Sequence, residues 1–241
     1  WGAYCLDALR AAGIAVAAAQ PDAALRPGVT VSLSTPQDRA LVTFPGAIAA
    51  LRADEVDDAL LAGANHLHVS SYCLQRALRP DCRALFARAH AAGLSTSLDP
   101  GFDPQQAWAS DLLDTLEEVD LFLPNEVELA AITGREQVLD GLRALHNGRT
   151  QTVVKRGQLG CASLDQGQLL EVPAFAVDPV DSTGAGDSFD AGFLHAWLRG
   201  QTLHDCMRWG SACGSLSTRR TGGTAGQASV PEVDTLLANV P

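Results

Sequence analysis

Short apolar runs rich in β-branched residues alternate with amphipathic stretches along most of the chain. The apolar runs predict strands at residues 29–33, 40–44, 66–70, 94–98, 120–123, 152–155, 161–164 and 169–177. The amphipathic stretches predict helices at residues 54–61, 81–92, 104–116, 126–132, 136–146, 187–198 and 203–219, with a short last helix begun by Pro231 and Glu232. Strands that alternate with helices favour one α/β domain, residues 1–241, in which a mainly parallel sheet lies between two helical layers.

The composition narrows the class of protein. The chain has 241 residues, 28 acidic and 17 basic, and a formal net charge of −11. This acidic excess argues against a nucleic-acid partner, because such proteins need basic surface to meet phosphates. No run of about 18 uncharged apolar residues occurs, so no membrane span is predicted. We therefore expect a cytoplasmic globular protein that binds neither nucleic acid nor membrane.

A run of small residues leads directly into the helix predicted at residues 187–198. The run is Gly184, Ala185 and Gly186, and Asp187 follows it. The N–H groups at a helix start are unpaired and carry partial positive charge, and small residues let a phosphate approach them closely. An acid at this place would repel a phosphate, but it could accept a proton from a substrate hydroxyl. The alternative is that Asp187 only caps the helix and the glycines only form a turn.

Other motifs fit this segment less well. A P-loop requires a Lys after its last glycine, and no such Lys follows Gly186. In a dinucleotide-binding GxGxxG motif the third glycine would stand where the chain has Phe189. Ser188 does not lie in the GxSxG elbow of a hydrolase.

The thirteen residues 181–193 closely resemble the C-terminal signature of the PfkB (ribokinase-like) family of carbohydrate kinases, with Ser182 in place of the usual Thr. The resemblance extends over the whole chain. It implies a ribokinase-like three-layer fold and ATP-dependent phosphorylation of a hydroxyl group on a sugar or sugar-like small molecule. Asp187 would be the catalytic base, and Gly184, Ala185 and Gly186 the anion hole. ATP and Mg²⁺ are the implied cofactors, with K⁺ as a further candidate.

Asn125 and Glu128 match the family's Asn-x-x-Glu motif, which organises Mg²⁺ and phosphate largely through water. Mg²⁺ prefers oxygen ligands and retains water, which agrees with this role. The same spacing also predicts a capping box, in which Asn125 caps the following helix and Glu128 reaches back. Both roles are compatible.

The resemblance implies further nucleotide and cation contacts. The residues expected to border ATP are Lys155, Gly157 and Gly160, in a turn that could also be an ordinary hairpin, and Gly223 in the loop 222–229. Asp181 and Ser229 correspond to a monovalent-cation site in the family. Asp99 follows a strand in a Leu-Asp-Pro segment and is expected near the phosphates or in a turn. His66 and His68 alternate along one strand, and we expect packed strand histidines rather than a zinc site.

Relatives in this family begin with a strand that carries a substrate-binding Asp, a lid and a Gly-Gly-x-x-x-Asn segment. None of these precedes Trp1, so we expect an N-terminally truncated kinase domain, without that strand and lid, that has little sugar kinase activity. Two alternatives stay open: a nucleoside kinase of the same fold, and a nucleotide-binding fragment without catalysis. The expected partner is a small-molecule sugar or nucleoside, with a homodimer in the complete protein.

Overall fold

In the computed structural model of the chain, residues 1–34, 39–108 and 111–239 are described. The central sheet has six strands in the order β3-β4-β5-β6-β7-β8. Three ladders are parallel and two are antiparallel, which confirms the predicted mainly parallel sheet. The parallel strands are β3 (His66–Val69), β4 (Ser95–Leu98), β5 (Leu121–Phe122) and β6 (Gln151–Lys155), and the antiparallel end is formed by β7 (Cys161–Asp165) and β8 (Gln168–Val172).

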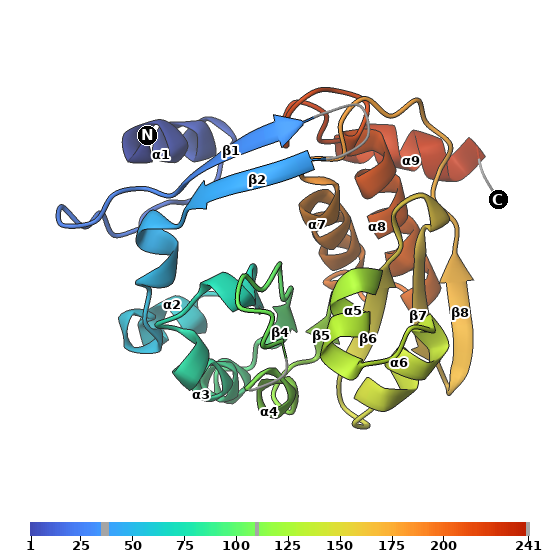
Figure 1. Ribbon diagram of the computed structural model, residues 1–241, viewed down its shortest axis with the longest axis horizontal. Helices are drawn as coiled ribbons and strands as arrows, with labels where there is room; N and C mark the ends of the chain where they lie inside the picture. Colours follow the sequence, from blue (N-terminus) through green and yellow to red (C-terminus); the bar gives the residue numbers. More distant parts are fainter. Residues whose placement is uncertain (35–38, 109–110, 240–241) are drawn as a thin grey trace.

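Helices cover both faces of this sheet (Figure 1). The helices are α1 (Gly2–Ala11), α2 (Asp58–Ala62), α3 (Arg79–Ala91), α4 (Leu112–Leu116), α5 (Glu126–Thr133), α6 (Val138–Leu145), α7 (Ala185–Trp197), α8 (Leu203–Ser217) and α9 (Val230–Asn239). Consecutive residues of a strand point to opposite faces. Phe122 accordingly packs in one core with residues of α3, α4, α5 and α6, whereas Leu121 packs in a second core with residues of α7, α8 and α9. Two separate cores on one sheet make the predicted three-layer arrangement.

The first two predicted strands form a sheet of their own. β1 (Val29–Ser34) and β2 (Arg39–Phe44) pair antiparallel, with Val29 opposite Phe44 and Val31 opposite Val42. Figure 1 shows this hairpin apart from the six-stranded sheet. Its short connection permits only an antiparallel neighbour, because parallel strands need a long crossover. The alternation of strands and helices therefore begins only at β3.

Three predicted elements are shorter than expected. The segment 104–116 is helical only in α4, because the carboxylate of Asp103 accepts bonds from the N–H groups of Gln105, Ala107 and Trp108 and shapes a loop instead. The segment 54–61 divides into a 3₁₀ turn, Ala53–Glu55, and α2. The strand expected at 169–177 ends at Val172, because the next residue is proline and lacks the N–H that a ladder needs.

Glycines let α7 and α8 approach each other closely. A Cβ atom at Gly192 would lie 2.6 Å from Cys213 Sγ and 2.7 Å from the Trp209 carbonyl oxygen. A Cβ atom at Gly210 would lie 2.9 Å from the ring of Phe189. These contacts fix α7, whose first turn carries the predicted base, against α8. No helix among the described residues is long and apolar enough to cross a membrane.

We expect Gly192→Ala to destabilise the protein, although Gly→Ala inside a helix ordinarily stabilises it. The added methyl group would have to displace backbone and sulfur atoms, so the free energy of unfolding should fall by about 1–3 kcal/mol. Urea unfolding of the variant measures this loss. The control is Gly2→Ala in α1, where no atom lies within 4 Å of the added carbon. Equal stabilities for the two variants would contradict the close packing.

Candidate active site

The predicted anion hole is the first turn of α7. Gly184 is the N-cap, with φ of 74°, and its carbonyl oxygen accepts from Ser188 N at 2.9 Å. Asp187 is the third residue of the helix and is exposed. The alternative in which Asp187 caps the helix is therefore wrong, because Gly184 occupies that place. Gly186 is exposed beside Asp187 and has no side chain to block an approaching anion.

The loop 222–229 packs directly on this turn. A Cβ atom at Gly184 would lie 2.7 Å from the Gly223 carbonyl oxygen. Asp181 ties the two segments together, because one carboxylate oxygen accepts from Thr183 N at 2.9 Å and the other accepts from Gly222 N at 2.8 Å. The hydroxyl of Ser229 donates to Glu232 at 2.8 Å at the start of α9. The structure thus brings Asp181 and Gly223 to the anion-hole turn and engages Ser229 in a helix cap.

The capping box at Asn125 is confirmed. Asn125 Oδ1 accepts from Glu128 N at 2.9 Å, and Glu128 Oε2 accepts from Asn125 N at 2.8 Å. Glu128 is buried, and this burial raises the pKa of its carboxyl, although the bonds to Asn125 lower it in part. Asn125 also forms a parallel bridge with Lys155, the last residue of β6. This bridge places the Asn-x-x-Glu motif next to the end of β6.

The side chain of Lys155 reaches two carboxylates. Its Nζ atom donates to Asp99 Oδ2 at 2.6 Å and to Asp190 Oδ1 at 3.0 Å. The three side chains are only 13%, 16% and 6% exposed, in the order Lys155, Asp99, Asp190. Burial lowers the pKa of Lys155, but the two carboxylates outweigh it and raise that pKa above its ordinary value. Burial has the opposite effect on an acid and raises the pKa of Asp190, and the positive charge of Lys155 offsets this increase only in part.

Sequence reasoning missed Asp190. The residue occupies a variable position of the signature, between Phe189 and Ala191, and no motif singles it out. One signal was present, because an acid between Phe189 and Phe193 lies on the apolar side of an amphipathic helix and needs a buried partner.

The turn after β6 joins β6 and β7 as an antiparallel hairpin, which is the alternative that the sequence analysis gave for this segment. Lys155 pairs with Cys161 across the antiparallel ladder, and Arg156 N donates to the Gly160 carbonyl oxygen at 2.8 Å. Gly160 has φ of 87°, and a Cβ atom there would lie 2.0 Å from the Val172 carbonyl oxygen. Gly157 also has positive φ, but no atom lies within 4 Å of such a carbon. Packing therefore requires a glycine at position 160, whereas a Cβ atom at position 157 would meet no neighbouring atom.

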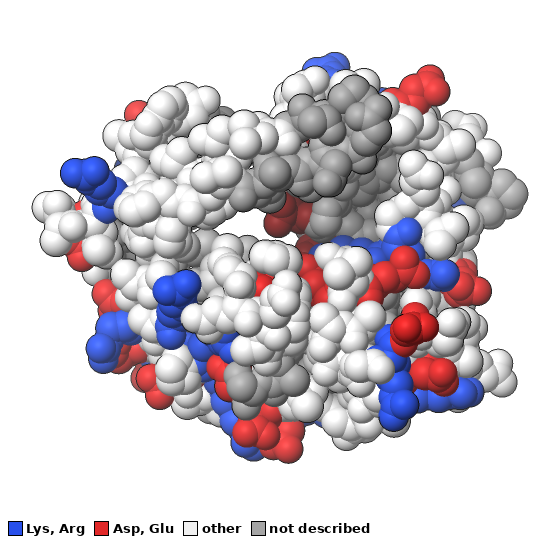
Figure 2. Space-filling view, viewed as in Figure 1, with Lys and Arg blue, Asp and Glu red and all other residues white. Residues whose placement is uncertain are grey.

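The space-filling view shows a hollow between the β1–β2 hairpin and the α/β body, with acidic side chains inside it (Figure 2). The first turn of α7 lies next to the carboxyl ends of β4, β5 and β6, which are followed or ended by Asp99, Asn125 and Lys155. We call this side, formed by the carboxyl ends of the parallel strands, the edge of the sheet. Ligands of parallel α/β sheets bind at this edge, beyond the carboxyl ends of the strands.

Comparison with known proteins identifies the family. The model of the "pfkB family carbohydrate kinase" matches residues 1–229. The chain belongs to the pfkB family. An ATP-dependent ribose-1-phosphate kinase from Halopiger xanaduensis is 33% identical over 77% of this pfkB chain, and a cytidine kinase from Thermococcus kodakarensis is 36% identical over 52% of it. These alignments span 57% and 47% of the two relatives.

The fold of this pfkB-family chain matches solved structures of the family. A Vibrio cholerae fructokinase, solved in a form bound to fructose, ADP and calcium ion, superimposes with a TM-score of 0.83. The match covers 98% of this chain and 81% of the fructokinase at 22% identity, so it shows the fold alone. It confirms the predicted ribokinase-like fold.

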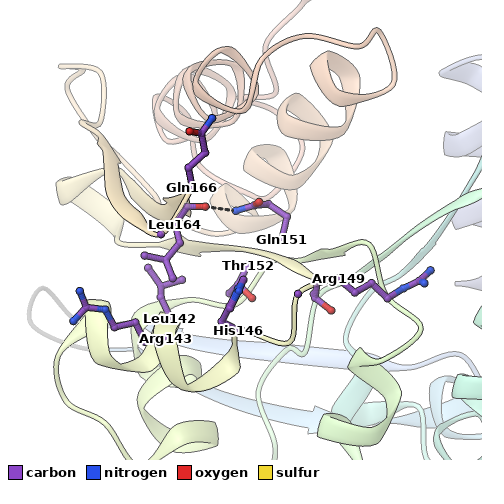
Figure 3. Close-up of a pocket in the computed structure, with 11 residues that line it drawn as sticks. Leu142, Arg143, His146, Arg149, Gln151, Thr152, Leu164 and Gln166 are labelled. Carbon is purple, nitrogen blue, oxygen red and sulfur yellow. Dashed lines mark hydrogen bonds between the residues drawn. The ribbon is translucent and has the colours of Figure 1, made fainter.

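A separate pocket of about 400 Å³ lies at the opposite end of β6 from Lys155. Gln151 and Thr152, which begin the strand, line it. Arg143 and Arg149 also line it, but their side chains point away from each other (Figure 3). The guanidinium of Arg149 is paired with Asp120 at 3.3 Å. The predicted anion-hole turn and the ion pairs of Lys155 lie at the other end of this strand, away from the pocket.

The residues of this pfkB-family site suit a metal ion that is bound mainly through water. Among the described residues no group of three or more His, Cys, Asp or Glu side chains could enclose a metal ion. Glu128 and Asp99 nevertheless lie close enough for the charge of Asp99 to raise the pKa of Glu128. Carboxylate oxygens beside a phosphate site are the donors that Mg²⁺ uses while it retains water.

His66 and His68 are packed strand histidines, as predicted. His66 Nδ1 lies 2.7 Å from Ser95 Oγ, and His66 Nε2 and His68 Nδ1 each lie 2.7 Å from Ser97 Oγ. Burial lowers the pKa of His66 to about 4, and burial also lowers the pKa of His68. Both rings therefore favour the neutral form in the folded protein.

This burial predicts a loss of stability in mild acid. Between pH 6.5, the ordinary His value, and about 4, the unfolded chain binds a proton on His66 that the folded chain does not. Stability should therefore decrease as the pH falls through this range. We expect His66→Asn to flatten this part of the profile of unfolding free energy against pH, measured by urea unfolding. The exposed His204→Asn is the control, and equal slopes in both variants would contradict the assignment.

Proposed function

We propose that the chain provides the phosphoryl-transfer site for moving the terminal phosphoryl group of ATP to a hydroxyl group on a sugar or sugar-like small molecule, with Asp187 as the general base, and that turnover by residues 1–241 alone is low, as expected above. The observation that carries the proposal is the first turn of α7, where an exposed acid directly follows an exposed, side-chain-free Gly186. The amides of this turn would stabilise the charge of the transferring phosphoryl group. The acid next to them would accept the proton of the attacking hydroxyl.

Positioning and charge neutralisation carry most of the catalysis in phosphoryl transfer, which needs little covalent help from the protein. Base and anion hole come from one helical turn, so a single rigid element orients both. The support for this rigidity is the glycine packing of α7 on α8 and the contact of Gly184 with Gly223. Family membership supports a nucleotide substrate, and the carboxyl ends of the parallel strands are where ligands of such sheets bind.

We propose that the nucleotide site is bordered by five residues from three segments: Asn125 before α5, the residues Lys155, Gly157 and Gly160 at the β6–β7 turn, and Gly223 in the loop 222–229. Mg²⁺ would be held through water by Glu128 and would neutralise phosphate charge when bound. Asp181 and Ser229 stay the proposed residues for a monovalent cation such as K⁺. The predicted cytoplasmic location and homodimer also stay predictions.

The acceptor is proposed at the level of a class. The relatives named above act, by their names, on ribose-1-phosphate and on cytidine, so a nucleoside is the second candidate acceptor. An assay of phosphate transfer across a panel of free sugars, sugar phosphates and nucleosides separates these candidates. Transfer to a sugar supports the first proposal, and transfer to nucleosides alone supports the second.

We expect the chain to bind ATP, and to bind it about tenfold more weakly when Mg²⁺ is removed, because the ion neutralises phosphate charge. Isothermal titration calorimetry with and without a chelator measures both affinities. Glu128→Gln should reduce the difference between them. A folded chain that binds no ATP at millimolar concentration would overturn the proposed function.

Asp187→Asn should lower kcat by about 10²–10⁴-fold, the usual cost of removing a general base, while ATP affinity stays within a few-fold. The matched control is Asp205→Asn, because Asp205 is also the third residue of its helix, α8, and lies outside the site. It should leave kcat unchanged. If Asp187→Asn kept normal turnover in a chain whose wild type is active, Asp187 would not be the base.

A further inference from the structure

Lys155, at the carboxyl end of β6, bonds segments that are far apart in the sequence. The backbone N–H of Lys155 donates to the Pro124 carbonyl oxygen at 2.8 Å, next to the Asn-x-x-Glu motif. Its ammonium group bonds Asp99 at the end of β4 and Asp190 in α7. Lys155 Nζ also lies 3.7 Å from the position that a Cβ atom of Gly186 would take. From the end of β6, Lys155 therefore bonds the segments that follow β4 and β5 and a residue of α7, and its ammonium group lies near the anion-hole turn.

Asp190 lies three residues after Asp187 on α7. Residues at this spacing lie on the same side of a helix, so the direction of one sets the direction of the other. Asp190 is buried and held by Lys155, and Asp187 is exposed at the end of the same face. A fixed Asp190 thereby fixes the rotation of α7 about its axis and, with it, the direction of Asp187.

We propose that Lys155 is a positioning residue, whose bonds to Asp99 and Asp190 hold the first turn of α7 at the angle that phosphoryl transfer requires. The inference rests on the proposed function and gives Lys155 a task within it. Two other roles are conceivable for this lysine. It could stabilise the fold without any effect on the turn, or it could leave the carboxylates and bind a phosphate of the nucleotide.

The charges favour the positioning role. Lys155 carries one positive charge against the carboxylates of Asp99 and Asp190, and all three side chains are largely buried. Without Lys155 the carboxyl groups of Asp99 and Asp190 would lose their cation, and one of them would have to take up a proton, because two adjacent buried carboxylates are strongly unfavourable. A lysine that moved to a phosphate would give up both ion pairs, so we expect its present bonds to persist when the nucleotide binds.

Hydrogen exchange tests the position of the turn without any assay of activity. We expect Lys155→Met to increase the exchange rate of amides in residues 184–190 about tenfold, because the turn loses its anchor. Asp190→Asn should change the same amides in the same direction. The control is Arg79→Met, which removes another largely buried cation, paired with Asp111, in the other core. Unchanged exchange of residues 184–190 in Lys155→Met would overturn the inference, even in a chain without activity.

Kinetics then separate the three roles. For positioning, Lys155→Met and Asp190→Asn should each lower kcat by about 10²-fold with KM for ATP within a few-fold, and the double variant should be no worse than the more impaired single one. A rise in KM for ATP in Lys155→Met alone would show a phosphate contact and overturn the inference. Normal kcat with reduced stability would show a merely structural ion pair. A wild-type chain that binds no ATP would end the proposed function, while the exchange result would still decide whether Lys155 holds the turn.

Discussion

A buried lysine between two carboxylates is the constraint on which the site depends. Charges in the interior are tolerated only when they are paired, so Lys155, Asp99 and Asp190 have to stay together. Asp99 follows β4 and Lys155 ends β6. Asp190 belongs to α7, which packs with α8 and α9 on one face of the sheet. The ion pairs thus tie the helix that carries the predicted base to the strand ends that border the proposed nucleotide site.

Close packing at glycines also holds α7 and its first turn in place. Gly192 and Gly210 let α7 lie close to α8, and Gly184 lets the loop at Gly223 press on the anion-hole turn. Each of these contacts excludes a side chain, and the first turn of α7 remains open to an approaching anion. The result is a rigid edge of the sheet with an exposed acid, Asp187, beside free space. Phosphoryl transfer needs this combination, because its catalysis consists mainly of position and charge.

The sequence predicted the features of the site that depend only on residues close together in the chain. The helix start at Gly184 and the capping box of Asn125 depend on neighbours within four residues, and the structure contains both. The ion pair of Asp190 depends on a residue 35 positions away, which no local pattern shows. The segment after Asp103 has a helical pattern, but the side chain of that acid binds the backbone and replaces the helix with a loop. The strands at 29–33 and 40–44 formed as predicted, but only the structure shows that they stand apart from the central sheet.

The most direct test of this account is a crystal structure of the chain with Mg²⁺ and a non-hydrolysable ATP analogue. The account predicts that the terminal phosphate lies within hydrogen-bond distance of the amides of residues 185–187, with Asp187 facing it. Lys155 should remain between Asp99 and Asp190. A nucleotide bound elsewhere, or a Lys155 side chain that has left both carboxylates for the phosphate, would contradict it.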